Sequence, residues 1–338
     1  ICDVQPEQGH RLVYETFPGG LHSGADFYQN DAGIMIGETT VLQTGFDASG
    51  TPQSNRIRKA AQYAASIDDV VRIMTTRNNG LYTNDWLIGD AKTGEILALA
   101  NQPIFNPNNR RDYQPGPMRN RAVIDTFEPG STIKPFVAAA VLERGLFHPD
   151  SVIDTPQTWL VGNKLVRDEH SHPHMTVTEI IQKSSNVGAV KLAMSLTPQQ
   201  HWEVLHRAGF GQLPGSGFPG ETAGRLRDAS TWRPVEQATM AYGYGLSVSL
   251  LQLTRAYMAF ANDGEVMPLS FLKREPQEIV GERVFSPSVA REVRAMKEAV
   301  TQEGGTGTLT RVPGYRVAGK TGTAHKLVDG HYSADRYL

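Results

Sequence analysis

The sequence predicts a mixed domain of class α+β (or α/β), and three observations support this class. Several segments carry apolar residues at helical spacing, while other apolar residues fall in short runs of strand length. Two of the short runs flank the turn sequence DAKTG, which is typical of a β-hairpin. Because strands joined by turns are mixed with separate helical segments, the sequence disfavours the pure classes.

Composition fits a globular protein with a substantial core. The 338 residues are 39% hydrophobic and 20% charged, enough for one large domain or two ordinary ones. A net charge of −2 gives no support to a nucleic-acid partner. The single cysteine, Cys2, excludes an internal disulfide and a cysteine-based metal site. The longest apolar run, about residues 136–142, is far shorter than the ~20 residues that span a bilayer.

The start of the chain is less informative than the rest. Residue 1 is isoleucine and no signal peptide follows it, so we expect a processed product or a piece of a longer protein. Residues 1–65 show weak periodicity and are rich in Gly, Asp, Gln and Thr. We expect loops and short strands there, and we place the main domain at residues 66–338.

The elements of the main region can be assigned in order along the chain. One helix is predicted over 55–80, where helical spacing ends in Asn-Asn-Gly, and the DAKTG hairpin follows it. A helix over 131–144 begins after Pro-Gly and is stopped by Gly145. Four later segments give two helices around the sequence SSN, a strongly apolar helix ended by Asp-Gly, a helix after SPS, and a glycine-containing strand over 315–328.

The segment FEPGSTIKPFVAAAVL places a hydroxyl and an amine at the start of an apolar helix. Ser131 and Lys134 are three residues apart, so they share one face of the helix. A lysine in dry surroundings loses its proton easily, and a neutral amine can activate a serine nucleophile. The alternative is an ordinary helix cap at Ser131 with Lys134 in solvent. Taken alone, a Ser-x-x-Lys pair does not decide between them.

Two further motifs favour the catalytic interpretation. The sequence SSN over 184–186 lies between two helices, and KTGT over 320–323 lies in the predicted strand. Each could be a simple turn. The ordered set Ser-x-x-Lys, Ser-x-Asn and Lys-Thr-Gly is the one found in penicillin-binding proteins and serine β-lactamases. Three separate coincidences in that order are improbable, so we interpret them as one active site.

From about residue 90 to 338 the chain resembles the transpeptidase domain of class B penicillin-binding proteins, most closely the cell-division type, FtsI. The stretches that carry the likeness are DAKTGEILALANQPIFNPNNR, MRNRAVIDTFEPGSTIKPF, IIQKSSNVGAVKLA, YGYGLSVSLLQLTRAYMAFANDG and GYRVAGKTGTA. The resemblance implies a serine β-lactamase/transpeptidase-like fold, with an antiparallel sheet flanked by helices and a helical subdomain.

The resemblance also implies a role for each motif residue. Ser131 would be the acylated nucleophile, and Lys134 would accept its proton. Ser184 would bond Lys134 and pass protons toward the leaving amine, while Asn186 would hold Lys134 and the substrate amide. The oxyanion hole would use the backbone N–H groups of Ser131 and Thr323.

The third motif is implied to bind the substrate. Lys320 would supply positive charge near the substrate carboxylate, with Thr321 and Thr323 as hydroxyl donors. Gly322, which has no side chain, would let a peptide backbone approach the edge of the strand.

The implied activity is that of a peptidoglycan D,D-transpeptidase in septal cell-wall synthesis. A D-Ala-D-Ala stem peptide would acylate Ser131, and the amine of a neighbouring stem would then form the cross-link. β-Lactam antibiotics would acylate Ser131 stably, and no metal or other cofactor is required. The implied partners are stem peptides, a glycan polymerase of the FtsW type and other division proteins, at an inner membrane with the catalytic domain in the periplasm.

Three other functions compete with this one. A serine β-lactamase shares the motifs, but the chain lacks a Glu-x-x-Leu-Asn-like stretch after Asn186, and Ser185 stands where those enzymes carry aspartate. A low-molecular-weight D,D-carboxypeptidase lacks support in the surrounding sequence. A non-catalytic penicillin sensor would be acylated without turnover.

A metal site is a further alternative. His170, His172 and His174 alternate in the sequence DEHSHPH, so on a strand they would face one way and could bind zinc. The competing interpretation is a polar, solvated loop.

The chain differs from the resembled family at both ends. Upstream, the family has a cytoplasmic tail, one membrane-spanning helix and an elongated pedestal domain, of which residues 1–65 would be a remnant, with the anchor absent from this chain. Downstream, the family continues with two further strands and a C-terminal helix, which we therefore expect to be missing after Leu338. Their loss would expose a sheet edge, so we expect the chain alone to be poorly active.

Overall fold

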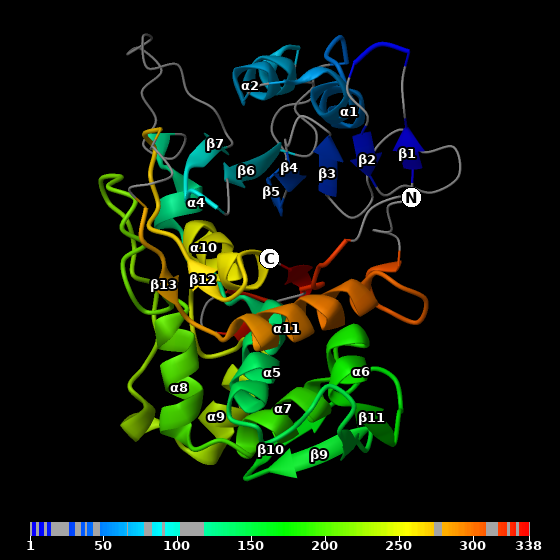
Figure 1. The fold of residues 1–338 in the computed structure, drawn as a ribbon, viewed down its shortest axis with the longest axis vertical. Coiled ribbons are helices and arrows are strands. Elements are labelled where there is room, and N and C mark those ends of the chain that lie inside the picture. Colours follow the sequence, from blue (N-terminus) through cyan, green and yellow to red (C-terminus); the bar gives the residue numbers. More distant parts are fainter. Residues whose placement is uncertain are drawn as a thin grey trace.

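The computed structural model of the chain consists of helices and small antiparallel sheets (Figure 1). The structure describes residues 2–4, 7–9, 12–14, 27–30, 35–37, 39–42, 48–65, 67–77, 83–89, 92–101, 118–273, 279–308, 317–322, 325–328 and 331–337. The α+β class predicted from the sequence is confirmed. In the described part of the chain, no helix has the length and apolar character needed to cross a membrane.

Two sheets occupy the N-terminal part of the molecule. One is a four-stranded antiparallel meander of β1 (Cys2–Val4), β2 (Leu12–Tyr14), β3 (Phe27–Asn30) and β4 (Met35–Gly37). The other contains β5 (Thr39–Leu42), β6 (Thr83–Gly89) and β7 (Ile96–Ala100). The β6–β7 pair confirms the predicted hairpin. Because β5 pairs with β6, strand pairing crosses residue 65, where the domain boundary remains a prediction.

The single helix predicted over 55–80 is wrong. The structure has two helices, α1 (Gln53–Tyr63) and α2 (Ile67–Thr75), which pack against each other. The break is at Ala64, whose backbone is extended. In one straight helix Ile57 and Val70 would lie ~20 Å apart along the axis. Folding back at Ala64 lets both side chains be buried, which explains why the helical spacing in the sequence continues across the break.

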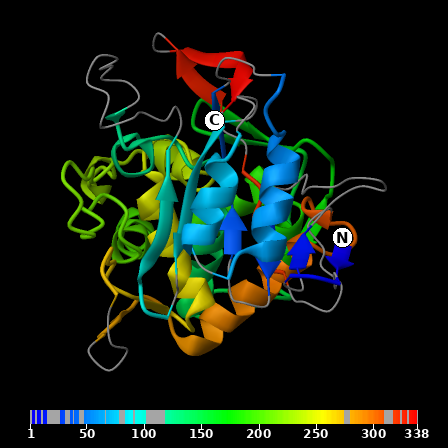
Figure 2. The ribbon, with the colours of Figure 1, turned by 90° about the horizontal axis from the view of Figure 1, so that it is seen from above.

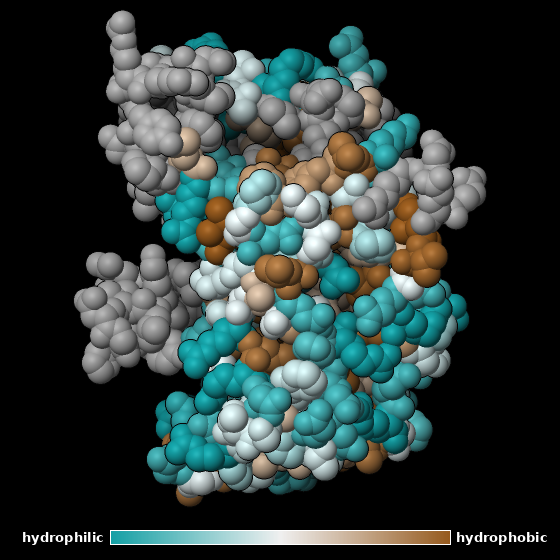
Figure 3. All heavy atoms as spheres, turned by 90° about the vertical axis from the view of Figure 1, so that its left-hand side faces the viewer, coloured by the Kyte–Doolittle hydropathy of each residue, from teal (hydrophilic) through white to brown (hydrophobic). Residues whose placement is uncertain are grey.

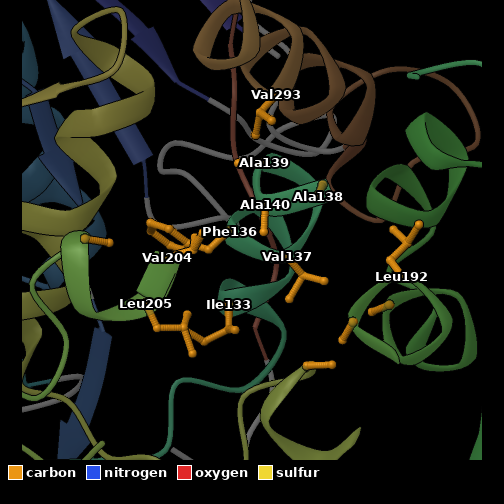
Figure 4. Packing of buried hydrophobic residues seen from close by; sticks show 14 of the residues in the cluster. Ile133, Phe136, Val137, Ala138, Ala139, Ala140, Leu192, Val204, Leu205 and Val293 are labelled. Carbon is orange, nitrogen blue, oxygen red and sulfur yellow. The ribbon is translucent and has the colours of Figure 1, made fainter. Parts of the chain in front are cut away.

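The C-terminal part is largely helical and surrounds α5. Four helices, α6, α7, α8 and α11, contact it. Figure 4 shows the apolar side chains of α5 pointing toward residues of these neighbours. The described helices here are α4 (Arg121–Ile124), η2 (Gly130–Ile133), α5 (Lys134–Glu143), α6 (Val177–Gln182), α7 (Asn186–Met194), α8 (Pro198–Arg207), η3 (Ala229–Thr231), α9 (Pro234–Met240), α10 (Leu250–Ala261) and α11 (Pro287–Val300). The predicted helices at 131–144, before and after SSN, and after SPS are confirmed.

The remaining strands form two-stranded pairs. They are β8 (Val152–Asp154) with β11 (His174–Thr176), β9 (Thr158–Val161) with β10 (Lys164–Arg167), β12 (Glu265–Val266) with β13 (Glu282–Arg283), and β14 (His325–Val328) with β15 (His331–Tyr337). The β14–β15 hairpin lies at one side of the molecule when it is seen from above (red in Figure 2). The strand predicted over 315–328 is only partly right, since residues 317–322 are not in a strand and β14 starts at His325.

The surface is that of an ordinary globular domain. On the face shown in Figure 3, apolar residues form separate groups among hydrophilic ones.

Two glycines pack backbone against backbone beside the start of α5. Gly243 has a left-handed φ of +87°, and the N–H of Gly130 donates to the carbonyl of Gly243 at 3.2 Å. A Cβ atom at Gly243 would lie 2.0 Å from the carbonyl oxygen of Gly130. Neither backbone can move without shifting the turn that begins α5, so this contact fixes the helix N-terminus against the 242–245 segment.

We predict that Gly243→Ala lowers the free energy of unfolding by about 3 kcal/mol or more, from the left-handed backbone and the contact with Gly130 together. The matched control is Gly215→Ala. Gly215 also has a positive φ, of +73°, but a Cβ atom there meets nothing within 4 Å, so only about 1 kcal/mol should be lost. Denaturant unfolding of the two variants measures the difference, and equal losses would show that the backbone contact is unimportant.

Candidate active site

Ser131 lies in η2, the short turn that leads into α5. Gly130 adopts a left-handed φ of +55°, and Pro135 stands in the first turn of α5, where its missing N–H breaks no helical hydrogen bond. These two residues start the helix, and the apolar residues that follow bury it. Ser131 itself stays half-buried and lines a cavity. Its hydroxyl is therefore held at the end of a rigid helix and faces open space.

Lys134 is buried, with only 1% of its surface exposed. Its Nζ donates to the carbonyl of Ser184 at 2.6 Å, to Oδ1 of Asn186 at 2.7 Å and to Oγ of Ser184 at 3.2 Å. All three donor directions of the amine are thus used. The structure therefore brings the first and second motifs together around one amine.

Burial lowers the pKa of Lys134 well below its usual range, and the charge of Lys320 lowers it further. Asp168 and Glu169 act in the opposite direction with a smaller effect. A lysine of this kind can be neutral and accept a proton. Among the described residues, no hydrogen bond joins Ser131 Oγ to Lys134 Nζ, so the roles of nucleophile and base remain predictions.

Ser184 has a backbone conformation that is uncommon for a residue with a side chain. Its φ is +59°, in the left-handed region. The residue connects α6 to α7, and both its carbonyl and its hydroxyl accept hydrogen bonds from Lys134. The unusual backbone is therefore associated with the contact that the buried amine needs.

Asp168 is a site residue that the sequence interpretation missed. Its carboxylate is 5% exposed and accepts hydrogen bonds from the Ser185 hydroxyl, from the N–H of Asn186 at 2.6 Å and from the N–H of Val187 at 3.0 Å. A carboxylate at the N-terminus of α7 is favoured by the helix dipole. Asp168 thereby holds the second motif in place. Its only sequence signal is its position in the DEHSHPH segment, which we had interpreted for its histidines.

Lys320 connects the third motif to the second. Its Nζ donates to Ser184 Oγ at 2.7 Å and to the carbonyl of Thr321 at 3.0 Å. Burial lowers its pKa to about 7. Since Lys134 also donates to Ser184 Oγ, one hydroxyl joins both amines. A proton can pass between the three groups along existing hydrogen bonds.

Gly322 lies against the nucleophile turn. A Cβ atom at this position would lie 2.8 Å from Cγ2 of Thr132. The Thr132 carbonyl in turn accepts a hydrogen bond from the Tyr257 hydroxyl at 2.8 Å. A glycine at 322 thus allows the third motif to approach the start of α5. Thr323, the last predicted substrate-binding residue, lies outside the described residues.

The motif residues open onto a cavity of about 1100 Å³. Four of the predicted residues line it: Ser131, Ser184, Asn186 and Thr321. Tyr244, expected from the sequence at the rim, also lines it. The other walls are β10, the segment 168–172, and the loop 304–306 after α11. The size suits a peptide or a drug-sized molecule.

The three histidines do not form one face of a strand. Only His174 lies in β11, where it is exposed and its Nδ1 is 4.0 Å from an oxygen of Asp154. His170 and His172 precede the strand and line the cavity instead. Among the described residues, no group of three potential ligands could hold a metal ion. The zinc hypothesis is therefore not supported, because the strand begins too late to align the three side chains.

The arrangement suits acyl transfer by a serine nucleophile. The hydroxyl of Ser131 lies at a helix N-terminus beside backbone N–H groups that can stabilise an oxyanion. A buried amine that can be neutral belongs to the same turn, and a second amine can bind an anionic group.

Comparison with known proteins identifies the family. A family model described as "Penicillin binding protein transpeptidase domain" matches residues 86–337. The "Probable peptidoglycan D,D-transpeptidase PenA" of Neisseria gonorrhoeae is 49% identical over 251 residues, which are 74% of this chain and 42% of that protein. The "Peptidoglycan D,D-transpeptidase FtsI" of Escherichia coli (strain K12) is 40% identical over 281 residues, 81% of this chain and 47% of the relative. The chain thus spans less than half the length of these two relatives.

A solved structure gives the same result. The transpeptidase domain of Burkholderia pseudomallei penicillin-binding protein 3 superposes with a TM-score of 0.68 at 44% identity, covering 75% of this chain and 72% of that one. The family match covers most of the chain, and the motifs Ser-x-x-Lys, Ser-x-Asn and Lys-Thr-Gly meet in one place. The chain belongs to the penicillin-binding protein transpeptidase family.

Proposed function

We propose that this chain carries the catalytic domain of a peptidoglycan D,D-transpeptidase with Ser131 as its nucleophile. The observation that carries the proposal is the buried Lys134, which begins the same helix as Ser131 and binds Ser184 and Asn186. A buried amine on the same turn as a cavity-facing serine has a clear chemical use. The names of the relatives, which are peptidoglycan D,D-transpeptidases, supply the substrate class.

In the first step, Ser131 Oγ attacks the carbonyl carbon of the penultimate D-Ala of a stem peptide. Lys134 takes the proton from the hydroxyl as the new C–O bond forms. The peptide C–N bond then breaks, and the leaving D-Ala amine receives a proton through Ser184, which both lysines contact. The backbone N–H groups of Ser131 and Thr323 are the proposed oxyanion donors.

In the second step, the amine of a neighbouring stem attacks the acyl-enzyme. The new amide bond joins the fourth residue of one stem to the third residue of the other, and Ser131 regains its proton. In both steps Lys320, Thr321 and Thr323 hold the substrate carboxylate or backbone, and Gly322 allows its close approach. A β-lactam would acylate Ser131 in the same way, since its amide resembles the donor peptide.

The cellular role is proposed from the relatives. We propose septal cell-wall synthesis at the inner membrane, with the catalytic domain in the periplasm and with an FtsW-type polymerase and other division proteins as partners. The likeness to FtsI of Escherichia coli supports this role. The chain is also 35% identical over 337 residues to the "Probable peptidoglycan D,D-transpeptidase PbpC" of Pseudomonas aeruginosa, so cell-shape synthesis outside division is the competing role.

We predict that incubation with benzylpenicillin adds the mass of one intact penicillin to Ser131, because the hydroxyl opens the lactam ring without losing a fragment. Intact-protein mass spectrometry with peptide mapping measures this. Ser131→Ala should remove the adduct, while Ser195→Ala should keep it, because the Ser195 hydroxyl only donates to the Leu192 carbonyl at the end of α7.

Two results would contradict the proposal. An adduct that survives in Ser131→Ala would place the nucleophile elsewhere. Rapid loss of the adduct in the parent chain would indicate a β-lactamase, and stable acylation without cross-linking by the full-length protein would indicate a penicillin sensor.

We predict that the second-order rate constant for acylation by benzylpenicillin falls as the pH rises through about 7. Burial lowers the pKa of Lys320 to about 7, so above this pH the amine loses the charge that attracts the penicillin carboxylate. Lys134 acts in the opposite sense, because only its neutral form accepts a proton. Stopped-flow acylation across a pH series measures both limbs.

The control for this prediction is Lys320→Arg, because arginine stays charged throughout the accessible pH range. The falling limb should be absent from its profile. A falling limb at the same pH in this variant would assign the titration to another group.

A further inference from the structure

The loop that follows α11 bridges the elements that carry the second and third motifs. The N–H of Thr306 donates to the carbonyl of Gln182 at 3.2 Å, and the Gln182 side chain donates to the carbonyl of Glu303 at 3.0 Å. Gln182 is the last residue of α6, two positions before Ser184. At the base of the loop, the N–H of Gly307 donates to the carbonyl of Val300 at 2.9 Å. Both sides of Thr306 are thus fixed by backbone hydrogen bonds.

Thr306 also contacts the third motif directly. Its Oγ1 is 2.8 Å from Oγ1 of Thr321, and both residues line the cavity that contains Ser131. Thr306 lies in none of the three motifs, and the sequence gave no reason to select it. Its hydroxyl is the one side-chain oxygen shown to contact the Thr321 hydroxyl among the described residues.

Hydrogen-bond counting assigns a direction to this contact. A threonine hydroxyl has one proton to donate and can accept two hydrogen bonds. Lys320 Nζ is a donor only and lies 3.4 Å from Thr321 Oγ1. If the Thr306 hydroxyl donates as well, the acceptor positions of Thr321 are filled. The proton of Thr321 is then free to point into the cavity.

We propose that Thr306 is a positioning residue that holds the Thr321 hydroxyl with its proton directed at the carboxylate of the bound substrate. This inference rests on the proposed function, in which Lys320 and Thr321 receive that carboxylate. A hydrogen bond to a carboxylate is stronger than one between neutral groups, so its orientation affects acylation. Thr306 acts through Thr321 and need not touch the substrate.

A purely structural role for Thr306 makes a different prediction. A loop that only supports the cavity wall would affect every acylating agent equally. The proposed role affects only agents with a carboxylate. We therefore compare benzylpenicillin with its methyl ester, in which the lactam is the same and the negative charge is absent.

The experiment measures the acylation rate constants of both agents for the parent chain, Thr306→Val and Thr306→Ser. Valine keeps the shape of threonine but cannot donate, while serine keeps the hydroxyl. We expect Thr306→Val to lose roughly tenfold with benzylpenicillin and less than about twofold with the ester. Thr306→Ser should stay within about threefold of the parent with both agents. The matched control is Thr231→Val, in which an exposed hydroxyl that donates to the Asp228 carbonyl is removed.

The outcomes separate this inference from the proposed function. Equal losses with both agents, or no loss in Thr306→Val, would overturn the role of Thr306 while acylation of Ser131 stands. Equal impairment of the serine and valine variants would also overturn it. A parent chain that neither agent acylates would overturn the proposed function, and the role of Thr306 with it.

Discussion

The site depends on keeping one amine dry and neutral inside the protein. A buried ammonium without partners costs several kcal/mol, so Lys134 is tolerated because its donors meet the carbonyl and hydroxyl of Ser184 and the amide of Asn186. The same burial lowers its pKa and makes it a base. Much of the surrounding structure supports this one environment. The apolar residues of α5 exclude water, and the left-handed backbone at Ser184 turns two oxygens toward the amine.

A second layer of contacts holds the groups that meet Lys134. Asp168 binds the Ser185 hydroxyl and two backbone N–H groups at the start of α7, so the second motif is anchored by a carboxylate from outside it. Lys320 reaches Ser184 from the third motif, and Gly322 abuts Thr132 beside the nucleophile. Residues far apart in the sequence are thus joined by direct contacts, and a change at any one of them displaces the others.

The sequence was most informative where a local rule decides the outcome. Glycine and proline before α5, the capping residues Thr176 and Glu179 of α6, and the DAKTG turn all produced the expected elements. The approximate positions of the motif residues followed from their order. Asp168 and Thr306 could not be found in this way, because each contacts a motif 15 or more residues away and belongs to no repeating pattern. The break at Ala64 was missed for a similar reason, since α1 and α2 continue the same helical spacing and only their packing separates them.

The cavity is assembled from segments scattered between residues 131 and 321, and none of them contains it alone. A partly folded molecule, with either end of this span detached, has no cavity although all its side chains are present. On the proposed function, labelling with a fluorescent penicillin would therefore count natively folded molecules rather than total protein. The same chain would then serve as its own reporter of folding yield during refolding or thermal inactivation.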